Sequence, residues 1–160
     1  MSDRVPQVSQ YGSVDPAPPS SLGDIETWKN SLVNDDIPLF QRMRNVFALR
    51  NDGSDESCLA LCHGFNSKSA LLRHELAYVL GQMQNNVALP SLIERLDDLQ
   101  EHVMVRHEAA EAMGAIGDIS VKQVLEKHLA DLNPEVSESC EVALDLLAWC
   151  NPDEWGETKW

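Results

Sequence analysis

The amino-acid sequence predicts an all-α solenoid of four helical hairpins, and two observations support this fold class. From Leu22 onward apolar residues recur at helical spacing, and no segment shows the alternation that is typical of a strand. The chain also repeats itself, because "RHELAYVLGQM" from Arg73 aligns with "RHEAAEAMGAI" from Arg106. A repeat of about thirty residues is typical of solenoids, in which each unit packs against its neighbours.

The same register extends toward both ends of the chain. One repeat length after Arg106, "SCEVALDLLAW" from Ser139 is apolar at corresponding positions. Nearly one repeat length before Arg73 lies "RMRNVFALR" from Arg42. Two-helix repeats of this length belong to the HEAT class or its relatives. We therefore expect helices at residues 23–34, 37–50, 54–65, 69–83, 87–98, 103–116, 119–131 and 134–150.

Capping residues support these boundaries. Pro38 opens one helix after two aspartates, and Asn133 followed by Pro134 is typical of a helix start, where proline needs no amide hydrogen. Gly117 and Asp118 are expected to end one helix and cap the next. Pro90 lies at or inside the start of its helix, where its missing amide hydrogen disturbs the boundary.

Composition divides the chain and limits its partners. The proline-rich residues 1–21 are expected to form a disordered or extended linker, residues 22–150 the four repeats, and residues 151–160 a C-terminal tail. The 26 Asp and Glu against 12 Lys and Arg give a net charge of -14, which argues against nucleic acid or an anionic membrane as partner. A cationic partner fits this charge.

The cysteines and the N-terminal residues predict a cytoplasmic protein. Cys58, Cys62, Cys140 and Cys150 form no CxxC pair and are too sparse for a disulfide scaffold, so we expect small buried hydrophobic residues. The first residues lack the apolar stretch of a signal peptide, and no apolar run is long enough for a transmembrane helix.

A His-Glu pair occurs twice on otherwise apolar helices, as His74-Glu75 and as His107-Glu108. A carboxylate placed beside an apolar stripe loses hydration unless it meets a cation or a metal. Equivalent helices of neighbouring repeats stack side by side, so both pairs are expected on one surface. Imidazole with carboxylate suits iron, manganese or zinc, and two histidines with one carboxylate is the usual ligand set of non-haem Fe(II) oxygen chemistry.

Two interpretations of the repeated pair stay open at this point. One is a metal site, and the other is a buried His–Glu hydrogen bond that was copied with the repeat. The outer repeats carry Met43-Arg44 and Cys140-Glu141 at the equivalent positions, so the fold does not need the pair. The spacing matches neither the zincin motif nor the Glu-x-x-His of ferritin-like bundles. His63, His102 and His128 lie near helix ends and are expected to be solvated or capping.

The segments "SALLRHELAYVLGQMQ" and "MVRHEAAEAMGAIGD", in register on HEAT-like hairpins, closely resemble the deoxyhypusine hydroxylase family. "SVDPAPP", "FALRN" and "SCEVALD" are also similar to that family, and the resemblance runs from Tyr11 to about Leu146. It implies a di-iron monooxygenase that uses molecular oxygen to hydroxylate the deoxyhypusine side chain of the hypusine-containing translation factor. His74, Glu75, His107 and Glu108 match metal ligands of the family, and Met104 matches a position close to the active centre.

In that family four His-Glu motifs, two in each half, bind two irons. This chain has two such motifs. The chain therefore resembles the C-terminal half, and we expect the missing N-terminal half or a second copy to complete the site. The alternative function is a HEAT-repeat protein-binding module without catalysis, in which the His-Glu pairs persist from ancestry. A plain structural scaffold is a third possibility.

Overall fold

The computed structural model describes residues 4–155. Eight paired helices and a short ninth one make up the described chain: α1 (Ile25–Leu32), α2 (Leu39–Asp52), α3 (Asp55–His63), α4 (Ala70–Met83), α5 (Leu89–Asp97), α6 (Val103–Ile116), α7 (Lys122–Lys127), α8 (Pro134–Cys150) and α9 (Pro152–Trp155). Residues 4–155 contain no strand, only an isolated bridge between Val8 and Val14. The predicted all-α class is confirmed.

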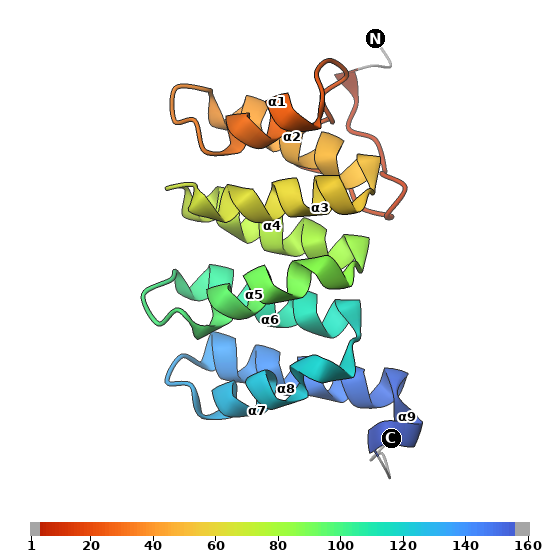
Figure 1. Cartoon of the computed structure of the whole chain (residues 1–160), viewed down its shortest axis with the longest axis vertical. Coiled ribbons are helices and arrows are strands. Elements are labelled where there is room, and N and C mark those ends of the chain that lie inside the picture. The colour runs from red at the N-terminus through yellow and green to blue at the C-terminus, as the bar shows by residue number, and fades with distance from the viewer. Residues whose placement is uncertain (1–3, 156–160) are drawn as a thin grey trace.

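The hairpins stack along the long axis of the molecule, from α1 and α2 at one end to α7 and α8 at the other (Figure 1). The second helices of the hairpins form a continuous layer, because α2 packs on α4, α4 on α6 and α6 on α8. One apolar core runs through all four hairpins. The predicted solenoid of four hairpins is therefore present, and its second-helix layer carries both His-Glu pairs.

Several helix ends follow the capping signals of the sequence. Gly117 adopts a left-handed φ of 79° and its amide donates to the Met113 carbonyl, so α6 ends there as predicted. The Asp118 side chain accepts from the Ser120 amide and opens the next turn. Asn133 precedes α8 but makes no capping bond. Its side-chain amide donates to Asp131 instead, while Asn133 still holds the N-cap position with Pro134 as the first helical residue, as expected.

The first helix of three hairpins is shorter than predicted, because short 3-10 turns replace its ends. These turns follow α3, precede α5 and flank α7: Gly64–Asn66, Asn86–Ala88, Ile119–Val121 and His128–Ala130. The side chains of Asn85 and Asp118 each accept a hydrogen bond from the backbone amide two residues later. This local bond competes with the backbone hydrogen bonds of an α-helix. The second helices, which form the site layer, have no such interruption, and α6 and α8 have the predicted bounds.

Two glycines allow the second helices to approach closely. A Cβ built on Gly81 of α4 would lie 3.1 Å from the Ala112 Cα of α6, and one on Gly114 would lie 3.0 Å from the Ala143 Cα of α8. Gly114 follows Gly81 by one repeat length, so the two glycines hold equivalent positions in their repeats. The close approach of α4, α6 and α8 is therefore a property of the repeat, and it sets the spacing of the His-Glu pairs.

Substituting Gly114→Ala should destabilise the protein by about 1–3 kcal/mol, since the new methyl group would lie 3.0 Å from the Ala143 Cα atom, closer than an ordinary van der Waals contact. Chemical denaturation of the variant measures this change. The control substitution Glu141→Ala changes an exposed residue of α8 and should leave the free energy of unfolding within about 0.5 kcal/mol of the wild-type value. Equal stability of the two variants would contradict the close packing of α6 and α8.

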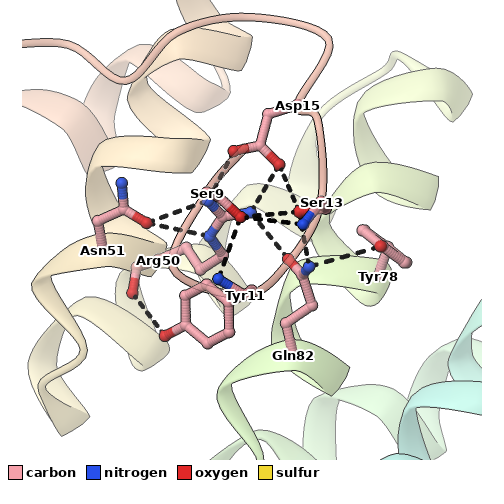
Figure 2. A network of polar contacts seen from close by, with 8 residues as sticks. All are labelled: Ser9, Tyr11, Ser13, Asp15, Arg50, Asn51, Tyr78 and Gln82. Atoms are coloured by element: carbon pink, nitrogen blue, oxygen red, sulfur yellow. Dashed lines mark hydrogen bonds and ion pairs between the residues drawn. The ribbon is translucent and has the colours of Figure 1, made fainter. Parts of the chain in front are cut away.

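The residues before α1 fold back at Gly12, where a bridge joins Val8 and Val14, and the segment is anchored by Arg50 (Figure 2). The Arg50 side chain is fully buried and forms two hydrogen bonds with the Asp15 carboxylate, at 2.9 and 2.7 Å. Its guanidinium also lies 4.7 Å from the Tyr11 ring centroid. Gln82 of α4 accepts from Arg50 and donates to Ser13, which ties the segment to the second hairpin as well.

A buried ionic network holds α6 to the loop before α8. Arg106 donates to the Leu96 carbonyl at 3.0 Å and to the Asp131 carboxylate at 2.6 Å. His128 lies beside Asp131 and bonds Asp97 at 2.6 Å. Burial would raise the pKa of Asp131, but hydrogen bonds from Arg106 and Asn133, together with the Arg106 charge, lower it to about 2. Arg106 immediately precedes His107, so this network fixes the helix that carries the second pair.

The lowered pKa predicts how the stability contribution of Asp131 depends on pH. Because the folded pKa of about 2 lies below the ordinary value of 3.8, the contribution is complete above pH 3.8 and is lost as pH falls through about 2. The substitution Asp131→Asn should therefore lower the free energy of unfolding at neutral pH, and the difference from wild type should shrink in this acidic window. Denaturant unfolding at a series of pH values measures it; a constant difference would contradict the assignment.

None of the helices in the described part of the chain is long and apolar enough to cross a membrane.

Candidate metal centre

The two His-Glu pairs occupy equivalent places on α4 and α6. His74 and Glu75 follow Arg73, and His107 and Glu108 follow Arg106, one repeat later. Each arginine anchors its helix to other parts of the chain. Arg73 forms bonds of 2.7 to 3.1 Å to the Glu101 carboxylate and also donates to the Ser67 carbonyl at 2.9 Å. The imidazoles are thus carried by helices that the neighbouring arginines hold in place.

Glu108 lies close to both imidazoles. Its Oε2 atom is 3.1 Å from Nε2 of His74 and 3.6 Å from Nε2 of His107. The Glu108 residue is only 7% exposed, so its charge lacks the hydration that would offset it in solvent. Adjacent ligand atoms around a six-coordinate metal are about 3 Å apart, because each metal–ligand bond is about 2.1 Å long. The two contacts of Glu108 are close to that spacing.

Glu75 lies on the other side of the His74 ring. Its Oε2 atom is 4.0 Å from Nδ1 of His74, which is too long for a hydrogen bond. That Nδ1 atom is buried and has no hydrogen-bond partner among the residues that the structure describes. Burial raises the pKa of the Glu75 carboxyl. The charge of His74 opposes this rise, whereas the nearby carboxylates of Glu108 and Asp15 add to it.

The proton state of His74 responds to the same carboxylates. Its hydrogen bond with Glu108 raises the pKa of the imidazole, and burial opposes the rise. The charges of Glu108, Glu75 and Glu111 raise this pKa further. An acidic environment of this kind favours any cation at this position, whether a proton or a metal ion.

Glu111 joins the cluster, although sequence reasoning did not select it. His107, Glu108 and Glu111 offer ligand atoms that all lie within 4.8 Å of one another. Glu111 is one helical turn after His107, and its Oε1 atom lies 3.8 Å from the His107 Nδ1 atom. The i,i+4 spacing on a single helix was the signal that could have found it. His74 and Glu75 lie outside this compact group and meet it through Glu108.

Met104 lies one turn before His107 and lines a pocket between α6 and α8. Its side chain is exposed, and the pocket has a volume of about 340 Å³. The lining combines carboxylates with apolar groups: Met104, His107, Glu111, Glu135, Glu138, Ser139 and Val142. Such a lining suits a cationic side chain with an aliphatic body. The residues from α8 were not selected from the sequence.

Of the other histidines, His102 caps α6, since its Nδ1 atom accepts from the Met104 amide at 3.2 Å. His63 is half-buried at the end of α3. His128 is the C-cap residue of α7, but its side chain is not solvated, because it is 6% exposed and pairs with Asp97 and Asp131. The four cysteines are free, and Cys58 and Cys140 are buried as expected, whereas Cys62 is half-buried and Cys150 is exposed.

The family model for HEAT repeats matches residues 59–145, which is more than half of the chain. The chain belongs to the HEAT-repeat family. This membership agrees with the stacked hairpins, and it places the two His-Glu pairs on the second helices of two successive HEAT units.

This HEAT-repeat chain is also similar to proteins of one named activity. It is 46% identical to the deoxyhypusine hydroxylase of Danio rerio over 91% of the chain and 48% of that relative. It is 48% identical to the deoxyhypusine hydroxylase of Candida albicans over 95% of the chain and 49% of that relative. The resemblance seen in the sequence is confirmed, and the chain spans about half the length of the curated relatives it matches.

A solved structure agrees with this likeness. The structure of human deoxyhypusine hydroxylase in complex with glycerol matches with a TM-score of 0.86 and 46% identity. The match covers 91% of this chain and 50% of the human chain. The similarity in structure therefore extends over most of this chain.

Proposed function

We propose that this chain supplies half of an iron- and oxygen-dependent deoxyhypusine hydroxylase that acts on the hypusine-containing translation factor. The similarity to deoxyhypusine hydroxylases supports the reaction, and one observation in the structure supports the place where it occurs. Glu108 lies 3.1 Å from the imidazole of His74 and 3.6 Å from that of His107, so ligands from two successive repeats meet at one carboxylate.

The donor set suits iron. Two imidazoles with carboxylates form the ligand type that proteins use for non-haem Fe(II). The partly dehydrated Glu108 is a group that a cation bound beside Nε2 of His74 would stabilise. On the Glu75 side of the ring, the buried Nδ1 atom of His74 has no partner within the described chain. His74, Glu75, His107 and Glu108 would hold the metal, and Glu111 lies within reach as a further carboxylate. Bound iron would supply the activation of molecular oxygen.

In the proposed overall reaction, a substrate C–H bond is replaced by C–OH with one atom of dioxygen. The other oxygen atom leaves as water, with two electrons from an external reductant and two protons. The residues of this chain bind and orient the substrate. Glu111, Glu135 and Glu138 give the pocket the charge that attracts amine groups, and Met104 with Val142 packs against the aliphatic part. The net charge of -14 favours the approach of a cationic side chain.

Two irons need more ligands than this chain places in the cluster. Each six-coordinate ion takes up to six donor atoms, and the His-Glu pairs here provide four side chains. We propose that a second set of His-Glu pairs completes the site, either from the other half of the length of the relatives or from a second copy of this chain.

An oxygen-dependent hydroxylation assay tests whether a second set of His-Glu pairs is needed for activity. The chain alone should show little hydroxylation of a deoxyhypusine-containing protein, and addition of a polypeptide that corresponds to the other half of a relative should restore it. Light scattering of the same samples gives the assembly. Full turnover by a strict monomer would show that two His-Glu pairs suffice. Absence of turnover in every combination would favour a protein-binding module without catalysis.

A further inference from the structure

Ser139 of α8 contacts the His107 ring from the neighbouring hairpin. Its Oγ atom lies 2.6 Å from the His107 Nδ1 atom and 2.6 Å from the carbonyl oxygen of Glu135. Ser139 is 6% exposed, so solvent has little access to the hydroxyl group. The partners of this hydroxyl are therefore set by the protein.

The positions of the protons follow from these two distances. A carbonyl oxygen only accepts, so a distance of 2.6 Å between it and the Ser139 Oγ atom requires the hydroxyl proton to lie between them. A serine in a helix commonly donates to the carbonyl four residues earlier in this way. The hydroxyl has a single proton, which it donates to the Glu135 carbonyl. The hydrogen bond between Ser139 and His107 must then be donated by the imidazole, from Nδ1–H.

The other ring nitrogen of His107 faces a carboxylate without a hydrogen bond. Its Nε2 atom is 3.6 Å from Oε2 of Glu108, beyond hydrogen-bond distance. A neutral ring that is protonated at Nδ1 presents a lone pair at Nε2. Two groups that bear lone pairs then face each other at this distance, and a cation between them would stabilise both.

We propose that Ser139 is a positioning residue, which holds His107 in the Nδ1–H tautomer and leaves the Nε2 lone pair directed toward Glu108. That this lone pair binds a metal rests on the proposed function, whereas the tautomer does not. Nothing in the sequence marks Ser139 for this role, because it lies 32 residues after His107 and reaches the ring through the packing of α6 on α8.

Long-range proton–nitrogen NMR on the metal-free, nitrogen-15-labelled chain reads the tautomer directly. At mildly alkaline pH, His107 should show a protonated Nδ1 and an unprotonated Nε2. In Ser139→Ala the Nδ1–H loses its acceptor within hydrogen-bond distance, because the Glu111 carboxylate is 3.8 Å away, so the tautomer mixture should shift toward protonated Nε2. Ser139→Thr keeps a hydroxyl that can donate to the same carbonyl, and it should restore the wild-type pattern. The matched control is Ser137→Ala, which removes a hydroxyl that bonds the Pro134 carbonyl on the same helix.

A titration with Zn²⁺ alone gives the second readout. Removing a group that orients a ligand typically weakens metal affinity about 10–100-fold, and we expect this loss for Ser139→Ala but not for Ser137→Ala. A protonated Nε2 in the wild-type chain would overturn the proposal, as would a Ser139→Ala variant with unchanged tautomer and affinity. Since the tautomer is read without metal or substrate, it can fail while the hydroxylase proposal stands, and the reverse also holds.

Discussion

Replacing His107 by alanine should reduce iron affinity at least about 100-fold while changing the Tm by less than about 3 °C. The affinity falls because the substitution removes one of the two imidazoles beside Glu108. The Tm changes little because the outer repeats fold with Met43 and Cys140 at the equivalent positions, so the hairpin does not depend on a histidine there. His74→Ala should behave in the same way. Anaerobic Fe(II) titration and thermal unfolding measured by circular dichroism give both quantities.

The matched control for these variants is His63→Ala, which removes a half-buried histidine from α3 rather than from the second-helix layer. It should keep the iron affinity of the wild-type chain. The opposite result for His107→Ala, a large fall in Tm with unchanged iron content, would show that the pair is a buried hydrogen-bonding device copied with the repeat and not a metal site.

Replacing Arg50 by alanine should lower the free energy of unfolding by about 3–5 kcal/mol, because it leaves the Asp15 carboxylate without its buried partner. Arg50 is 0% exposed and also contacts the Tyr11 ring, so the segment before α1 should lose its attachment to α2 and α4. Denaturant unfolding measures the stability, and proteolysis of residues 4–24 reports the detachment.

A substitution of an exposed cation separates this effect from a simple change of net charge. Lys68→Ala also removes one positive charge, from a side chain that is 88% exposed and 3.4 Å from Asp35. It should change the free energy of unfolding by less than about 1 kcal/mol. If the Arg50 and Lys68 variants lose similar stability, the buried pair does not anchor the N-terminal segment.

The sequence was sufficient to predict the hairpins whose helices carry strong repeat signals. Both α6 and α8 have the predicted bounds, because Gly117 ends the first and Pro134 opens the second. For α7 the expected helix at 119–131 is reduced to Lys122–Lys127. There the Asp118 side chain accepts a hydrogen bond from the Ser120 amide and forms a local turn in place of the first helical turn. Hydrophobic periodicity gives no sign of such a side-chain bond.

The candidate site was predicted where it depends on the repeat and missed where it depends on packing between repeats. The approach of His74 to Glu108 follows from their equivalent places on stacked helices. Ser139 and the carboxylates of α8 reach the pocket only because Gly114 lets α8 lie against α6. The buried pair of Arg50 and Asp15 was also not predicted, because the two residues are 35 positions apart and belong to no repeated motif.

Hydroxylation under isotopically labelled dioxygen is the most direct test of the proposed chemistry. The chain should be loaded with Fe(II) and combined with the polypeptide that corresponds to the other half of a relative. A reductant and a deoxyhypusine-containing protein are then supplied. We predict that the label appears in the new hydroxyl group, that it requires iron, and that it disappears when Glu108→Gln replaces the wild-type chain. Hydroxylation that proceeds without iron, or product without the label, would contradict the account.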